Sequence, residues 1–202
     1  MTNQYDAIVR NPELTPTLGN SARGEIQILT DPAPDSAGVV YQDPYIRVVR
    51  DQVRFPSGKL GTYIRILLSS SRVGGVCIVP TWENSYVFIR QFRHAARSWQ
   101  LEFPRGFAEP TASLSDNASR ELLEELGAST TEMEFVGELY ADSGLIGSSI
   151  GVFRADLSEP PQPIGDTGAA QLVLARAPEV RDLIKTGQII DAISIAAFAR
   201  VS

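Results

Sequence analysis

Residues 106–128 of this 202-residue chain read GFAEPTASLSDNASRELLEELGA, and this stretch decides how the rest of the sequence is interpreted. Good helix formers fill its second half, so we predict a helix over residues 113–126. Ser115 or Asp116 is expected to cap its N-terminus, because a short polar side chain can accept a hydrogen bond from an unpaired backbone N–H. Gly127 is expected to end the helix, since glycine readily adopts the left-handed conformation found at helix C-termini.

Three acidic residues lie on one face of this predicted helix. Glu121 is three residues before Glu124 and four before Glu125, and residues at these spacings are neighbours on a helix surface. Like charges so placed cost an isolated helix roughly a few tenths of a kcal/mol per pair, and a bound cation would reverse that cost. An all-oxygen ligand set favours Mg²⁺, with Mn²⁺ as a possible substitute, over zinc. The alternative is an ordinary solvated helix face on which Arg120 pairs with Glu124.

A short segment before the helix favours the metal interpretation. Phe103, Pro104, Arg105 and Gly106 combine a proline with a glycine and are predicted to form a tight backbone turn. A loop at this place could offer a backbone carbonyl to the same cation that the helix carboxylates bind. The candidate site is therefore a turn followed by an acidic helix.

This combination resembles the Nudix box, which runs Gly, five residues, Glu, seven residues, Arg-Glu, an aliphatic, any residue, Glu-Glu, any residue, Gly. Such a long fixed spacing is far more specific than a single short motif. Residues 90–107 resemble the lead-in of the ADP-ribose pyrophosphatase-like branch of this family, and residues 184–200 resemble its closing helices. The resemblance covers roughly residues 45–200. The matching box positions are Gly106, Arg120, Glu121, Leu122, Glu124, Glu125 and Gly127.

The resemblance implies a set of metal ligands. The residue before the box glycine lends its backbone carbonyl to Mg²⁺, which here is Arg105. The carboxylate ligands are Glu121, Glu125 and, more variably, Glu124. Arg120 corresponds to the arginine that orients the neighbouring glutamate.

The resemblance also implies substrate contacts. Glu102 and Arg93 stand where relatives contact the substrate or the attacking water. A guanidinium at Arg93 or Arg97 suits a diphosphate, because its planar fork matches phosphate oxygens. Surface ion pairs remain the alternative for these two arginines. The expected substrate-binding residues are Arg93, Arg97, Glu102, Gly106 and Asp142.

The sequence departs from the box at two acidic positions. Ala112 stands where the box has its first Glu, and Glu109 is three residues early. Ser148 stands where relatives commonly have a Glu that activates or positions water, and a hydroxyl is no carboxylate base at neutral pH. Asp142, Glu102 or a metal-bound hydroxide would then serve as the base, and the base stays unassigned. The alternative for Asp142 is an Asx-type cap.

The rest of the chain predicts an α+β fold, a Nudix α/β/α sandwich with a mixed sheet and an N-terminal antiparallel strand extension. Residues 1–44 are rich in turn formers and are expected to be an irregular extension with one short strand at 24–30. Residues 45–202 are expected to form the Nudix hydrolase domain, beginning with a long hairpin at 45–70. Further strands are predicted at 73–81, 86–92, 133–141 and 148–157, and further helices at 178–186 and 191–201.

Composition excludes several classes of function. The net charge of −6 disfavours a nucleic-acid partner, which needs clustered Lys and Arg. No segment approaches the roughly 20 apolar residues of a membrane helix, so we expect a cytoplasmic protein without a membrane partner. The lone cysteine, Cys77, is expected to be a small buried hydrophobe, and the lone histidine, His94, a structural or surface residue. Trp82 and Trp99 could stack on a base, but core or interface roles are the alternative.

The expected activity is Mg²⁺-dependent hydrolysis of a nucleoside diphosphate linked to another group, such as ADP-ribose or a nucleotide sugar. The small-molecule products would be a nucleoside monophosphate and a sugar phosphate. The resemblance also implies a homodimer. The alternative function is a catalytically weak module that binds ADP-ribose or a related nucleotide. A Nudix-derived transcription regulator would need a basic helix pair, which the sequence does not show.

Overall fold

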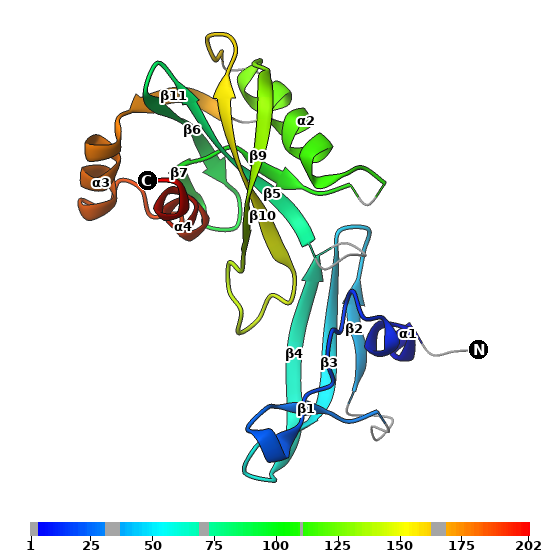
Figure 1. Cartoon of the computed structure of the whole chain (residues 1–202). Helices are drawn as coiled ribbons and strands as arrows, with labels where there is room; N and C mark the ends of the chain where they lie inside the picture. The colour runs from blue at the N-terminus through cyan, green and yellow to red at the C-terminus, as the bar shows by residue number, and fades with distance from the viewer. Residues whose placement is uncertain (1–3, 31–36, 69–72, 110, 163–168) are drawn as a thin grey trace. The chain divides into compact units, whose positions relative to one another are not determined.

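The structure is a computed structural model that describes residues 4–30, 37–68, 73–109, 111–162 and 169–202 (Figure 1). The chain forms two compact units. The N-terminal unit comprises residues 1–74 and 142–149, and the C-terminal unit comprises residues 75–141 and 150–202. Each unit is described by itself.

The N-terminal unit is an antiparallel sheet covered by one helix. Its long hairpin joins β3 (Ile46–Arg54) to β4 (Leu60–Leu68) in unbroken register, which confirms the hairpin expected at 45–70. Gly58 lies in its turn at a φ of +82°, a conformation that glycine adopts without strain. The other elements are α1 (Gln4–Arg10), η1 (Ser21–Arg23), β1 (Gln27–Ile28) and β2 (Gly38–Gln42).

The first 44 residues contain more regular structure than expected. The helix α1 buries Tyr5, Ile8 and Val9 in a small core that also contains Val49 and Leu67. Turn-forming residues had suggested an irregular segment, but this apolar face gains stability by packing on the hairpin. The strand expected at 24–30 shortens to the two residues of β1.

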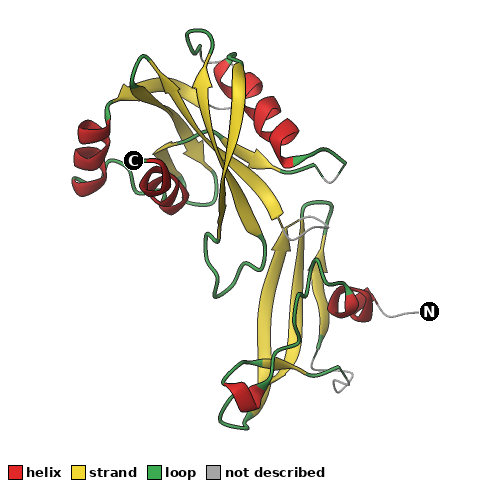
Figure 2. Ribbon diagram, viewed as in Figure 1, coloured by secondary structure: helices red, strands yellow, loops and turns green. Residues whose placement is uncertain are grey.

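The C-terminal unit is a mixed sheet with helices on both faces, as Figures 1 and 2 show. The strand order is β11-β6-β5-β10-β9, with β7 paired to β6 and β8 paired to β5. This confirms the expected α+β class with its α/β/α layers. The strands are β5 (Val73–Trp82), β6 (Ser85–Arg93), β7 (Ser98–Glu102), β8 (Arg105–Phe107), β9 (Thr130–Leu139), β10 (Ser149–Leu157) and β11 (Ala169–Ala175).

The alternation of side chains along β5 explains why helices lie on both faces. Val76 and Ile78 belong to the core that packs against α2 (Leu114–Leu126). Cys77 and Val79 belong to the opposite core, against α3 (Ala177–Lys185) and α4 (Ala192–Val201). A strand that is apolar at every position is therefore buried on both sides, as expected for a central strand. Cys77 is a buried, free cysteine, in agreement with the sequence interpretation.

The helix α2 begins within one residue of the predicted start and ends as predicted, but its N-cap differs from the prediction. Ser113, rather than Ser115 or Asp116, is the N-cap, and its hydroxyl accepts a hydrogen bond from the backbone N–H of Asp116 at 3.0 Å. Ser113 is the cap because its backbone has the extended conformation that an N-cap requires, whereas Ser115 and Asp116 already lie in the first turn of the helix. Gly127 ends the helix at a φ of +56°.

Three strands of the C-terminal unit were not predicted. β7 and β8 flank Phe103 and Pro104, so the segment expected to be a tight turn instead connects two short strands. β7 pairs with β6 and β8 with β5, and these pairings, rather than local sequence preference, fix the extended backbone. β11 pairs with residues 86–91 of β6, a stretch that overlaps the residues 89–93 paired with β7. Within the described residues, none of the helices has the length and apolar content to cross a membrane.

Candidate active site

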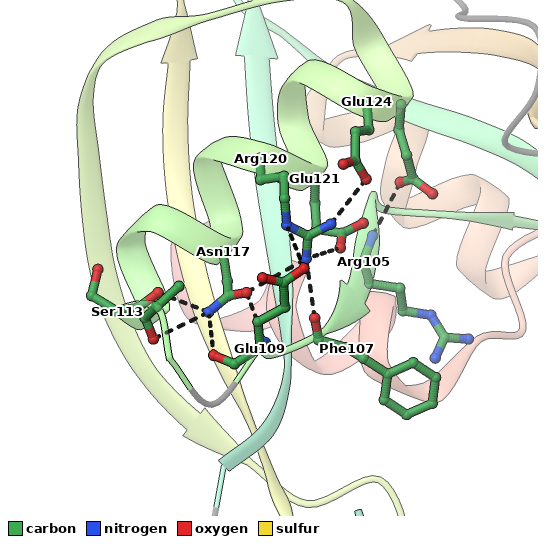
Figure 3. A network of polar contacts seen from close by, with 10 residues as sticks. Arg105, Phe107, Glu109, Ser113, Asn117, Arg120, Glu121 and Glu124 are labelled. Atoms are coloured by element: carbon green, nitrogen blue, oxygen red, sulfur yellow. Dashed lines mark hydrogen bonds and ion pairs between the residues drawn. The ribbon is translucent and has the colours of Figure 1, made fainter. Parts of the chain in front are cut away.

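Arg120 lies among acidic side chains on the exposed side of α2 (Figure 3). Its guanidinium is 2.8 Å from Glu121 Oε1 and 3.0 Å from Glu124 Oε2. It also donates a 3.3 Å hydrogen bond to the carbonyl of Phe107, directly after the box glycine. The pairing of Arg120 with Glu124 that was the alternative to a metal site is therefore present, and it coexists with an orienting contact to Glu121.

Glu125 points away from Arg120, toward the strand β8. Its Oε2 accepts a 3.2 Å hydrogen bond from the backbone N–H of Arg105. Glu125 is 5% exposed. Burial, reinforced by repulsion from Glu121, raises the pKa of Glu125 to about 7, and the Arg105 hydrogen bond only partly offsets this. Burial also raises the pKa of Glu121.

Gly106 allows the strand β8 to approach the helix carboxylates. A Cβ at this position would lie 2.2 Å from the carboxyl carbon and from Oε1 of Glu121. Glycine is needed at position 106 because there is no space for a side chain. It is not needed for an unusual backbone conformation, because Gly106 is not in the left-handed region. The glycine expected from the box is thus placed directly against Glu121.

A charge row of Arg93, Glu102, Arg105 and Asp191, in which Glu102 is the buried member, lies near Glu125. Glu102 is fully buried and uses both of its oxygens: Oε1 is 2.6 Å from Arg93 Nε, and Oε2 is 3.1 Å from Arg105 Nη2. The same Arg105 nitrogen is 3.3 Å from Asp191 Oδ1. Because both oxygens contact guanidinium groups, Glu102 is placed to hold Arg93 and Arg105 in position.

Two residues of this row were missed by the sequence analysis. Asp191 caps α4 by accepting from the backbone N–H of Ser194 at 2.8 Å, and Ser194 accepts from the backbone N–H of Phe103 at 2.9 Å. The only signal was an Asp three residues before a Ser at the start of an apolar helix, which predicts a cap and nothing about a distant loop. Their contact with the site depends on the fold.

Asn117 is a third residue that the sequence analysis missed. It is 1% exposed, and its amide donates to the carbonyls of Glu109, Ala112 and Ser113 while its oxygen accepts from the backbone N–H of Glu109 (Figure 3). It thereby ties the loop between Gly106 and α2 to the helix. Glu109 consequently lies with its carboxylate 3.8 Å from Arg120 Nε. Glu109 thus brings a carboxylate near the start of the acidic helix face, although the box position itself is held by Ala112.

Asp142 and Ser148 belong to the N-terminal unit. Asp142 accepts a 3.0 Å hydrogen bond from the backbone N–H of Gly144, which is the Asx-type turn that was its alternative interpretation. Ser148 is buried, and its hydroxyl accepts from the N–H of Leu68 at 2.9 Å and donates to its carbonyl at 3.3 Å. Ser148 therefore fastens its loop to the end of β4.

Arg97 is exposed in the turn between β6 and β7, away from the charged row formed by Arg93 and Glu102. It has a φ of +53°, lies 5.3 Å from the centre of the Phe92 ring and contacts His94 Nδ1 at 2.9 Å. His94 is exposed, as expected for a surface residue. Trp82 is partly buried against the core beneath α2, whereas Trp99 is 49% exposed beside Phe92.

The donors around Gly106 fit a hard divalent cation. Glu121 and Glu125 are buried carboxylates on one helix face, and the charge of Glu121 disfavours that of Glu125. Among the residues that the structure describes, no three acidic, His or Cys side chains lie close enough to hold a metal ion. Mg²⁺ does not need such a cage, because it is usually bound by one or two carboxylates while keeping several waters.

The acidic helix α2 follows the glycine-containing strand β8 and packs on one face of a mixed sheet, while α3 and α4 cover the other face. This arrangement is that of a Nudix-type α+β protein. A model of the NUDIX domain matches residues 71–174, about half of the chain, and the chain belongs to the Nudix family. Gly106, Arg120, Glu121, Glu124 and Glu125 all lie within the matched region.

Individual relatives agree with this assignment. The chain is 29% identical over 91 residues to ADP compounds hydrolase NudE of Escherichia coli, covering 45% of this chain and 49% of that protein. It is 32% identical over 83 residues to an uncharacterized Nudix hydrolase of Schizosaccharomyces pombe, covering 41% of this chain and 40% of that protein. These matches thus span less than half the length of either relative.

A solved structure supports the fold over a longer region. A crystal structure of an ADP compounds hydrolase superposes with a TM-score of 0.70 and 23% sequence identity, covering 86% of this chain and 93% of that one. This likeness confirms the Nudix fold, including the α+β architecture described above.

Proposed function

We propose that this protein is a Mg²⁺-dependent pyrophosphohydrolase that splits a nucleoside diphosphate linked to another group. The observation that carries the proposal is the placement of Glu121 and Glu125, both buried, beside Gly106 and the backbone of Arg105. Burying two like charges on one helix face is costly unless a cation accompanies them. Mn²⁺ is a possible substitute, since it accepts the same oxygen ligands.

In this proposal, the site residues of β8 and α2 have separate tasks. Glu121, Glu125 and the carbonyl of Arg105 would hold Mg²⁺, with Glu124 as a more variable ligand. The cation would supply charge neutralisation for the diphosphate and would lower the pKa of the attacking water. Arg120 orients Glu121 through its 2.8 Å contact.

The attack would occur in line at a phosphorus atom. A water oxygen forms the new P–O bond while the bond to the bridging oxygen breaks, so that one product is a nucleoside monophosphate and the other carries the second phosphate. The resulting proton must leave the water. The structure does not favour Glu102 as its acceptor, because both Glu102 oxygens are paired with arginines.

Arg93 is the proposed diphosphate contact. Its Nη2 atom is buried and, among the described residues, finds no hydrogen-bond partner. A buried, charged donor without a partner is costly, and a phosphate oxygen would satisfy it. Gly106 would allow close approach of the substrate, and Glu102 would place Arg93. Arg97 and Asp142 remain proposed substrate contacts on the resemblance alone.

ADP-ribose or a related nucleotide sugar is the proposed substrate. The support is the family resemblance together with the name of the Escherichia coli relative, an ADP compounds hydrolase. With ADP-ribose the products would be AMP and ribose 5-phosphate. We further propose a cytoplasmic homodimer whose hydrolase domain spans residues 45–202, with residues 1–44 as its extension, and no nucleic-acid partner for a chain of net charge −6.

The test is hydrolysis of a panel of nucleotide sugars and dinucleotides with Mg²⁺ or Mn²⁺. Metal-dependent turnover is expected for the natural protein and should be abolished by Glu125→Gln. Glu132→Gln, at an exposed position of β9, is the matched control and should keep full activity. Metal-independent turnover, or equal turnover in both variants, would contradict the proposal.

A second function is a nucleotide-binding module with little turnover. The observation that favours it is Ser148, whose hydroxyl is engaged with the backbone of Leu68 and supplies no carboxylate base. ADP-ribose binding in calorimetry, without hydrolysis of any compound in the panel, would support this function instead.

A further inference from the structure

The N-terminus of α4 is tied to the segment that precedes Gly106. The backbone N–H of Phe103 donates to Ser194 Oγ at 2.9 Å, and Ser194 Oγ donates to Asp191 Oδ2 at 2.7 Å. Asp191 Oδ2 also accepts from the backbone N–H of Ser194. One end of the segment from Glu102 to Arg105 is thus fixed by a relay of hydrogen bonds.

The other end of the same segment is fixed by charge. Arg105 Nη2 lies 3.1 Å from Glu102 Oε2 and 3.3 Å from Asp191 Oδ1. Ser194 is 1% exposed, and the side chains of Asp191 and Arg105 are 12% and 24% exposed, so these contacts are shielded from most of the solvent. Shielded ionic hydrogen bonds are stronger and better defined than exposed ones.

These contacts go beyond what the helix itself requires. Capping α4 needs a single carboxylate oxygen, and Oδ2 of Asp191 fulfils that role. The second oxygen is directed to Arg105, and the Ser194 hydroxyl is directed to Phe103, which lies between β7 and β8. Both surplus contacts converge on one four-residue segment.

That segment supplies the backbone groups of the candidate active site. The N–H of Arg105 donates to Glu125, and its carbonyl is the proposed Mg²⁺ ligand. Displacement of Phe103 or of the Arg105 side chain would therefore move the carbonyl relative to the helix carboxylates.

We propose that Asp191 and Ser194 are positioning residues, which hold the segment from Glu102 to Arg105 in the place where its backbone can bind a divalent cation together with α2. This inference rests on the proposed function. It assigns to the start of the last helix a task in the active site, although neither residue touches the substrate or the reacting atoms.

The test measures Mn²⁺ binding directly, from the electron paramagnetic resonance signal of free Mn²⁺, alongside kcat and the Mg²⁺ concentration at half-maximal activity. Asp191→Asn keeps an oxygen for the α4 cap but turns an amide NH₂ toward Arg105. We expect about tenfold weaker Mn²⁺ binding and an equal rise in the Mg²⁺ requirement, in the range seen when groups behind a metal ligand are removed.

Three further variants separate positioning from folding. Ser194→Ala should weaken Mn²⁺ binding similarly, and Ser194→Thr, which keeps the hydroxyl, should restore it. The double variant of Asp191→Asn with Arg105→Met should be no worse than Arg105→Met alone, because Asp191 acts through that guanidinium. Glu179→Gln in α3, which likewise keeps an oxygen to accept from the backbone N–H of Arg176 but removes the carboxylate charge, is the control and should leave binding unchanged.

The outcomes distinguish this inference from the proposed function. Natural protein that binds Mn²⁺ and hydrolyses substrate, with unchanged binding in folded Asp191→Asn and Ser194→Ala, would overturn the inference alone. Weakened binding in these two variants, with restoration by Ser194→Thr, would support it. Natural protein that neither binds Mn²⁺ nor hydrolyses any substrate would overturn the proposed function and this inference with it.

Discussion

The backbone N–H of Arg105 lies 3.2 Å from Glu125 Oε2. Through this contact, the residue before Gly106 fixes a helix carboxylate with its main chain while its side chain reaches Glu102 and Asp191. Arg105 thus links the acidic helix α2, the charge row and the last helix, α4. The position and the pKa of Glu125 consequently depend on its contact with β8 as well as on α2.

Glu125 should make the metal-free protein less stable as the pH rises. Its pKa in the folded protein is about 7, above the ordinary value of 4.5, so between these values the folded state keeps a proton that the unfolded state has lost. Stability therefore falls over this pH range and then levels off. At about 1.4 kcal/mol per pKa unit, the total loss is roughly 3 kcal/mol. Chemical denaturation in chelator across the range measures this change.

The matched variants identify the residue responsible. Glu125→Gln should flatten the decline, since glutamine does not titrate, and should stabilise the metal-free protein at pH 8. Glu132→Gln, at an exposed position, should keep the decline of the natural protein. A decline of equal size in both variants would show that another group is responsible.

Gly106→Ala should disrupt the site through a steric clash. The new Cβ would lie 2.2 Å from the carboxyl group of Glu121, so either the turn or the helix side chain must move. We expect a loss of about 1–3 kcal/mol in unfolding free energy, as for other overpacked positions, together with loss of turnover. Thermal and chemical unfolding would measure the first effect.

A second substitution checks this explanation of the Gly106→Ala effect. Adding Glu121→Ala removes the carboxyl group that the Cβ would meet, so the double variant should regain most of the stability while remaining inactive. If the double variant is as unstable as Gly106→Ala, the clash is not with Glu121.

Arg120→Lys should lower activity while the protein stays folded. Lysine keeps the positive charge but cannot contact Glu121, Glu124 and the Phe107 carbonyl at the same time. We expect kcat to fall about tenfold or more, because the orientation of a metal-binding carboxylate is lost. Arg176→Lys, which alters an exposed ion pair in front of α3, is the control. The measurement is kcat from steady-state kinetics with saturating Mg²⁺. Equal kcat values for Arg120→Lys, Arg176→Lys and the natural protein would contradict the prediction.

Ser148→Ala should cost stability and leave the chemistry intact. The hydroxyl bridges the N–H and carbonyl of Leu68, and removal of a buried partner of this kind costs about 1–3 kcal/mol. Activity per folded molecule should stay the same below the unfolding transition. A selective fall in kcat without a loss of stability would instead give Ser148 a part in the reaction.

The sequence predicted the elements whose local pattern is strong. The box helix, its stop at Gly127 and the hairpin over residues 45–70 follow from helix formers, glycine and alternating β-rich runs, and the structure has all three. The N-cap was assigned wrongly, because several short polar residues stand near the start of α2. Only the backbone conformation of Ser113 distinguishes it from its neighbours.

The supporting part of the candidate site could not be predicted in this way. Phe103 and Ser194 are 91 positions apart, and Arg105 and Asp191 are 86 apart. No periodicity or motif connects residues at such separations, because their contact is created by the packing of α4 on the sheet. Asn117 was missed for a related reason, since an asparagine within a predicted helix gives no sign that it satisfies three carbonyls of the loop before it.

The N-terminal unit is built from two separate stretches of chain, because residues 142–149 return to it from the C-terminal unit. This return supplies the bridge between Ile66 and Ile146 and the contacts of Ser148 with Leu68. A recombination event at a single point near Gly74 would therefore transfer residues 1–74 without residues 142–149, which belong to the same unit. An exchange of the first unit for that of a relative would therefore have to include residues 142–149, about 70 residues later in the chain.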